Sequence, residues 1–134
     1  MSDLDTHNLK GANLVGEDIS HAYLTKANIS DAYLIGANLS RATMHRANLH
    51  DASLRGANMN FADLNGADLT GARLTNARIK GAYLDGSDLR DTDLRYTDLT
   101  GADLTGAVGV DLTGVNAKQI TPPVGYKLVK QSYN

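Results

Sequence analysis

The most regular feature of this chain is a column of large aliphatic residues spaced five apart. From Leu4 to Leu104, every fifth residue is Leu, Ile or Met, twenty-one positions without an exception. Two residues before most of them stands a second column, thirteen alanines from Ala22 to Ala82 in steps of five. Self-similarity at one fixed period is typical of repeat architectures.

A period of five excludes both common secondary structures over this segment. On a helix of 3.6 residues per turn, each step of five rotates the side chain by about 140°, so the column winds around the helix. In a strand, alternate members of the column point to opposite faces. The pattern instead predicts a chain that turns a corner every five residues. Four pentads then bring the path back above its start, so that one coil takes about twenty residues.

The remaining positions of each pentad are polar or small, as an outward surface requires. The residue before the central aliphatic one is often Asn or Asp, and the residue after it is often Ser or Thr. Glycine recurs at the corner, where it adopts backbone conformations that strain other residues. The strings "AYLIGANLS", "ADLNGADLT" and "TDLTGADLTGA" resemble the A-(D/N)-L-x-x consensus of pentapeptide-repeat proteins. The resemblance covers about residues 2–107.

The resemblance implies an all-β fold, a right-handed quadrilateral parallel β-helix of about five coils. In that fold Leu, Ile or Met fills the central inward position and Ala the other inward position. After Leu104 the period ends, because Gly109 occupies the next central position. We therefore predict a pentapeptide-repeat β-helix over residues 1–107 and a C-terminal capping segment over residues 108–134. The amino end has no comparable cap, so we expect homodimer formation through the uncapped N-terminal coil.

The length and composition are those of a single domain, and they do not indicate whether its compartment is reducing or oxidising. The chain has 134 residues and no cysteine, so disulfides and thiolate chemistry are absent. The start lacks the basic and apolar regions of a signal peptide, and no apolar run reaches eighteen residues. We expect a cytoplasmic protein that makes no contact with a membrane.

The formal net charge of −2 conceals a segregation of acids and bases along the chain. One coil carries a carboxylate at the same pentad position on each of its four sides; we call these residues the carboxylate ring: Asp88, Asp93, Asp98 and Asp103. An earlier coil carries the basic belt: Arg41, His45, Arg46, His50 and Arg55. Arg73 and Arg78 precede Asp93 and Asp98 by twenty residues, so the spacing predicts ion pairs between neighbouring coils.

The carboxylate ring has two interpretations. Some pentapeptide-repeat proteins protect or inhibit DNA gyrase, and the resemblance implies that regularly spaced carboxylates imitate DNA phosphates in a basic groove. Those relatives are strongly acidic, however, and carry Phe at central positions, whereas this chain is nearly neutral and its one Phe, Phe61, stands at a corner. We favour the simpler interpretation, in which the ring only pairs with neighbouring bases. The basic belt does not change the picture, because a pI near 6 argues against direct binding of nucleic acid.

A second candidate surface is apolar. Val15 and Ile35 are twenty residues apart at an outward position, and Tyr33 lies beside them in the pattern. Stacked coils bring these three residues together, and an exposed apolar patch of this kind is typical of a docking surface.

The same architecture argues against catalysis and metal binding. Catalytic residues and metal ligands converge in a concave pocket, and a filled convex rod provides none, even for His45 and His50. A pocket-bearing enzyme would need a cleft where the chain turns irregular, and only the tail after Leu104 qualifies. We predict that the chain is not an enzyme and binds no cofactor or metal. The sequence favours a non-enzymatic scaffold or protein–protein interaction module with an unidentified protein partner. The alternative is a DNA-mimicking inhibitor or protector of gyrase or another topoisomerase.

Overall fold

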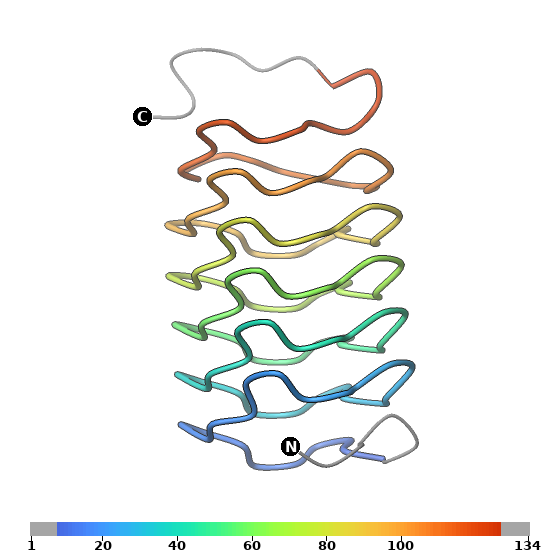
Figure 1. Cartoon of the computed structure of the whole chain (residues 1–134), viewed down its shortest axis with the longest axis vertical. Helices are drawn as coiled ribbons and strands as arrows, with labels where there is room; N and C mark the ends of the chain where they lie inside the picture. Colours follow the sequence, from blue (N-terminus) through green and yellow to red (C-terminus); the bar gives the residue numbers. More distant parts are fainter. Residues whose placement is uncertain (1–7, 127–134) are drawn as a thin grey trace.

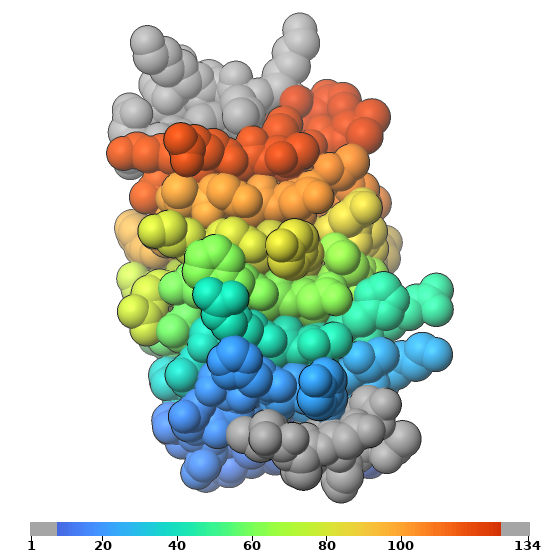
Figure 2. All heavy atoms as spheres, viewed as in Figure 1, coloured from blue at the N-terminus to red at the C-terminus, as the bar shows by residue number. Residues whose placement is uncertain are grey.

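The computed structural model describes residues 8–126, and the chain in this range forms a right-handed quadrilateral parallel β-helix. Successive coils stack in sequence order from the amino end to the carboxyl end and build a straight rod (Figure 1). In the space-filling view, side chains of each layer pack directly on those of the next (Figure 2). The fold class predicted from the period of five is confirmed.

Each side of a coil contributes a single bridged residue, so residues 8–126 contain neither a helix nor a continuous strand. Every bridge is parallel, and in the regular coils it joins residues twenty positions apart. Side 1 carries the bridged residues Asn8, Asn28, Asn48, Asp68, Asp88 and Val108, and side 2 carries Asn13, Tyr33, Ser53, Arg73 and Asp93. Side 3 carries Asp18, Asn38, Asn58, Arg78, Asp98 and Asn116, and side 4 carries Tyr23, Thr43, Asp63, Tyr83, Asp103 and Thr121.

Each corner is a four-residue turn that begins at the central aliphatic residue. The carbonyl of Leu9 accepts the amide of Ala12 at 3.0 Å, and the pattern repeats at every regular corner. From Gly11 (67°) to Gly101 (73°) the third residue of each turn has a positive φ, which is the geometry of a type II turn. Other corners place Lys26 or Phe61 in this conformation, at a cost of about 1 kcal/mol each. Among residues 8–126, none with a positive φ is β-branched, because that class fits this conformation worst.

The preference for Asn or Asp before the central residue has a direct cause in the hydrogen bonds. The ladder and the turn use the other amides of a pentad and leave the amide after the central residue unpaired. Asn58 meets this need, since its Oδ1 accepts the amide of Asn60 at 3.0 Å. Where Arg78 replaces the Asn, the amide of Lys80 donates to Oδ1 of Asn60, one coil earlier, at 2.9 Å. The outward polar positions therefore complete the backbone hydrogen bonding.

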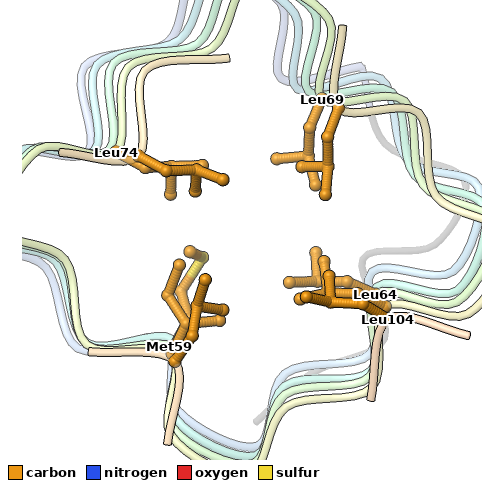
Figure 3. Close-up of a pocket in the computed structure, with 10 residues that line it drawn as sticks. Met59, Leu64, Leu69, Leu74 and Leu104 are labelled. Carbon is orange, nitrogen blue, oxygen red and sulfur yellow. The ribbon is translucent and has the colours of Figure 1, made fainter. Parts of the chain in front are cut away.

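The interior is a filled tube. Figure 3 looks along it and shows Met59, Leu64, Leu69, Leu74 and Leu104 pointing toward the centre from the four sides. The space left between the central side chains of the later coils is about 10 Å³, at the lower limit for one water molecule. The Ala column is buried as well, from Ala22 onward. The inward assignment of both columns is confirmed.

Three polar residues replace Ala in the later coils and remain buried. Ser87 and Thr97 donate their hydroxyl protons to the carbonyls of Leu84 and Leu94, both at 2.7 Å. The hydroxyl of Thr92 donates to the carbonyl of Leu69, also at 2.7 Å. All three hydroxyls are satisfied, so the substitution leaves none of them unpaired inside the tube.

The stack continues past residue 107 with a change of spacing. Val108 pairs with Asp88 twenty residues earlier, but Asn116 pairs with Asp98 and Thr121 with Asp103 at eighteen. Within residues 8–126, side 2 has no bridge above Asp93. Leu112, which the sequence places out of register, is buried and fills the central position of this irregular coil. Whether residues 108–134 act as a cap stays a prediction, because residues 127–134 lie outside the described range.

Candidate interaction surfaces

The apolar candidate lies on side 2 of the first two coils, and we call it the side patch: Val15, Tyr33 and Ile35. Val15 is 50% exposed, Ile35 41% and Tyr33 53%. The amide of Gly16, which follows Val15, donates to the carbonyl of Ile35 at 2.9 Å, so these residues lie on adjacent coils. The structure thus brings together the three residues that the sequence grouped.

The corner beside the side patch carries no side chains, because glycine occupies it in three successive coils. Gly16, Gly36 and Gly56 follow one another there, and a Cβ added at any of them meets no atom within 4 Å. The side patch therefore borders a flat strip of backbone that a partner can approach closely.

The carboxylate ring encircles one coil, so its four residues face in four directions. Asp88 accepts hydrogen bonds from the guanidinium of Arg90, with Nε to Oδ1 at 2.9 Å. Asp93 is held in the same way by Arg95, with Nη2 to Oδ2 at 2.8 Å. The hydrogen bonds from these guanidinium groups keep the pKa of both carboxyls below the ordinary value of 3.8.

The other two carboxylates of the ring bind hydroxyls. Asp98 and Asp103 accept the side-chain hydroxyls of Thr100 and Thr105, both at 2.5 Å. The bond from Thr100 lowers the pKa of Asp98. Half of the ring is neutralised by arginine, and its members do not line up along one face.

The predicted ion pairs between coils are wrong. Arg73 stacks on Asp93 and Arg78 on Asp98, as their spacing requires. Within residues 8–126, however, Asp93 forms its ion pair with Arg95 on its own side of the coil, and Asp98 forms none. Arg95 is two residues from Asp93 on the same side and reaches it in place of Arg73, whereas Asp98 accepts the hydroxyl of Thr100 instead.

Two members of the basic belt make local contacts. The guanidinium of Arg41 lies 4.8 Å from the centre of the Phe61 ring, a cation–π contact. His50 lies between Thr70, with Nδ1 to Oγ1 at 2.7 Å, and Asp51, with Nε2 to Oδ2 at 3.1 Å. The part of the chain that the structure describes contains no group of three His, Cys, Asp or Glu residues arranged to hold a metal ion.

Some corner side chains pack against glycines of the next coil, a feature that we did not predict from the sequence. A Cβ at Gly81 would lie 2.5 Å from the Phe61 ring, and one at Gly71 would overlap Oδ1 of Asp51. Both glycines follow their bulky neighbour by twenty residues, so the signal was present in the spacing. These glycines are required for space as well as for φ.

The first coil is less enclosed than the others. Leu9 and Leu14 are only partly buried, and Glu17 is exposed at a position where later coils carry Ala. The predicted self-association surface includes residues 1–7, which lie outside the described range, so homodimer formation stays a prediction. Across residues 8–126, no helix is long and apolar enough to cross a membrane.

These features define a class of protein, a β-helical solenoid with a filled aliphatic interior. A family model for pentapeptide repeats matches the chain in eight copies, over residues 8–41, 32–71 and 72–108. The chain belongs to the pentapeptide-repeat family.

Solved structures of the same family are similar to this chain. A pentapeptide-repeat protein from Nostoc PCC 7120 is 33% identical with a TM-score of 0.66, and the match covers 78% of this chain and 84% of that one. The protein Rfr23 from Cyanothece 51142 is 30% identical with a TM-score of 0.62, covering 87% and 83%. A pentapeptide-repeat protein of the Arabidopsis thaliana thylakoid lumen is 33% identical with a TM-score of 0.59, covering 79% and 68%. No curated protein sequence matches this chain.

Proposed function

We propose that this chain is a non-enzymatic scaffold that binds another protein through side 2 of its first coils. The observation that carries the proposal is the side patch, in which Val15, Tyr33 and Ile35 are exposed next to a corner of bare glycines. Exposed apolar residues that gather on a flat surface are typical of protein–protein contacts, because their burial removes apolar area from water.

The interior supports a structural role over an enzymatic one. Its lining is aliphatic, and the free space of about 10 Å³ admits no substrate. The rod thus offers its outer sides for binding.

The alternative, inhibition or protection of gyrase by DNA mimicry, has weaker support. Mimicry needs free negative charges in a row along the rod. In the carboxylate ring, Arg90 and Arg95 neutralise two members, and the four residues face different ways. We therefore keep it as the second candidate.

Affinity capture from extracts of the source cell tests the scaffold proposal. The bait is the full chain, compared with the double variant Val15→Ser and Ile35→Ser. The matched control is Val108→Ser with Val124→Ser, which removes two exposed valines outside the side patch. All three proteins should show the same melting temperature.

We expect a partner that is captured by the unmodified chain and the control and lost with the side-patch variant. A partner retained equally by all three would contradict the assignment of the side patch. Inhibition of DNA supercoiling by the unmodified chain would favour the second candidate instead.

A further inference from the structure

The last two coils differ on side 2 from the other three sides in their backbone hydrogen bonds. On side 1, Val108 donates to the carbonyl of Ser87 at 3.0 Å and accepts from the amide of Leu89 at 2.8 Å. On side 3, Asn116 makes the same two bonds, to Thr97 at 3.0 Å and from Leu99 at 2.8 Å. Each of these sides thus gains a complete β-bridge above the fifth coil.

Side 2 lacks this bridge. Asp111 stands where the bridging residue belongs, but its amide does not reach the carbonyl of Thr92, and its carbonyl does not reach the amide of Leu94. Within the described residues, that carbonyl and that amide have no other hydrogen-bond partner. Both residues are more than nine-tenths buried, Thr92 being 8% exposed and Leu94 3%. Two ladder groups of these residues therefore stay unpaired on side 2, on the side that faces the irregular coil.

The cause lies in the spacing of the irregular coil. Asp88 and Asp98 are ten residues apart, whereas their partners Val108 and Asn116 are eight apart. The two missing residues fall at the corner before Asp111, where Gly109 and Val110 replace a full turn. A shortened path keeps the register on sides 1 and 3 and pulls the chain away from the fifth coil on side 2.

An open cleft of about 410 Å³ results on side 2. It is lined by Asp91, Thr92, Asp93, Leu94, Arg95, Asp111 and Thr113. The volume lies in the range of sites that hold small ligands or short peptide segments.

The charge of the cleft indicates the kind of occupant. Arg95, the base in its lining, is bound to Asp93 at 2.8 Å. Among residues 8–126, Asp91 and Asp111 form no ion pair, since Arg90 is bound to Asp88. The hydrogen bonds from Thr113 lower the pKa of Asp111, so this carboxylate stays charged at neutral pH. The cleft carries a net negative charge next to unpaired ladder groups.

We propose that this cleft binds an extended, lysine- or arginine-containing peptide segment of a partner protein by completing the missing β-bridge. One residue of the segment donates its amide to the carbonyl of Thr92 and accepts the amide of Leu94. A basic side chain next to it meets Asp91 and Asp111. Main-chain pairing of this kind supplies affinity in many peptide complexes, and neighbouring side chains supply selectivity. This inference rests on the proposed scaffold function and names a second contact, on the same side as the side patch but at the other end of the rod.

Amide hydrogen exchange tests the first step in the free, full-length protein. Leu89 and Leu99 serve as internal controls, because their amides are bonded at the equivalent positions on sides 1 and 3. We expect the amide of Leu94 to exchange at least about 100-fold faster than either. Equal protection of all three amides would overturn the proposal. The proposal also fails if Leu94 is protected and loses that protection on removal of residues 127–134, because the chain's own tail would then fill the cleft.

A peptide titration followed by NMR tests the second step. The probe is an N-acetylated, C-amidated peptide of sequence Val-Lys-Val-Lys-Val, compared with the glutamate version and with a version N-methylated at the central valine. We expect only the lysine peptide to shift the amide of Leu94 and slow its exchange. N-methylation should weaken binding about tenfold, because it removes the amide that donates to Thr92. Equal binding of the lysine and glutamate peptides, or no binding at all, would contradict the proposal.

Charge variants of the protein identify the acidic contacts. Asp91→Asn with Asp111→Asn should weaken binding of the lysine peptide about fivefold. The matched control, Asp63→Asn with Asp85→Asn, makes the same change of charge on side 4 and should leave binding unchanged. If both double variants lose the same amount of peptide affinity, the effect comes from net charge alone and the assignment of the cleft as the binding site is wrong. Since the side patch lies outside the cleft, a captured partner without peptide binding would refute this inference and leave the scaffold function intact.

Discussion

The middle coils of this rod follow the repeat in both their inward residues and their ladder hydrogen bonds, whereas the last coils depart from it in both. From Ala32 to Leu84, every inward position is aliphatic and every ladder bond is made. From Ser87 onward, hydroxyls enter the interior, arginines bind carboxylates on the surface, and two residues are missing from the last turn. A solenoid therefore tolerates a shortened coil if three of its four sides keep their bridges, since the corners absorb the change.

The largest effect that separates the two regions should come from the core. Leu64→Ala empties a fully buried position between complete coils, and we expect a loss of about 2–5 kcal/mol in the free energy of unfolding. Leu112→Ala removes a buried leucine beside the cleft, where the chain has room to relax, so it should cost about 2 kcal/mol. Denaturant unfolding measures both. Arg73→Ala, an exposed change on the same rod, serves as the control. A larger cost at Leu112 than at Leu64 would contradict the stricter packing of the middle coils.

A smaller effect should distinguish two corners with the same backbone. Gly56 and Gly81 both have φ of 67°, but only Gly81 lies under a side chain, that of Phe61. Gly56→Ala should cost about 1 kcal/mol from backbone strain alone. Gly81→Ala should cost about 1 kcal/mol more, because the ring must move and gives up its contact with Arg41. Thermal unfolding compares the two variants. Equal melting temperatures would show that the ring moves aside freely.

The smallest effect concerns pH. The pKa is lowered for four carboxyls of the last coils: Asp88, Asp93, Asp98 and Asp111. A lowered pKa in the folded state adds stability above the unfolded value of 3.8, and that stability is lost as the pH falls through the folded pKa. We therefore expect amide protection in residues 88–116 to decrease before that of the middle coils, between about pH 4.5 and pH 2.5.

The middle coils provide the control for this pH effect. Within residues 31–85, no carboxylate accepts a hydrogen bond from a guanidinium, whereas Asp88 and Asp93 each do. Substituting Arg90→Gln and Arg95→Gln should reduce the difference between the two regions. Protection that falls uniformly along the rod would show that the surface carboxylates do not set the local stability.

The fold was predictable because one residue in five carries the decisive information. A Leu, Ile or Met at every fifth position fits neither a helix nor a strand, and it predicts a chain with one corner per pentad. The grouping of Val15 with Ile35 then follows from the twenty-residue coil. The partner of Asp93 was not predictable in this way. Stacking brought Arg73 beneath it, but the side chain of Arg95 reaches it from the same side of the coil.

The sequence gives only weak evidence of the cleft. Leu112 stands two residues ahead of the position that the period requires, which signals a shortened coil and nothing about where the chain opens. That the bridge is lost on side 2, while Asn116 and Thr121 recover theirs, depends on how the path closes in space.

The repeat was enough to predict the square cross-section, the inward columns and the order of residues on each side, because each pentad satisfies the pattern locally. The packing in three dimensions was needed to learn which arginine holds which carboxylate, which glycines make room for a neighbour, and where two backbone groups stay unpaired within residues 8–126. Those outcomes depend on distances between residues about twenty positions apart, and a pattern of residue types does not contain such distances.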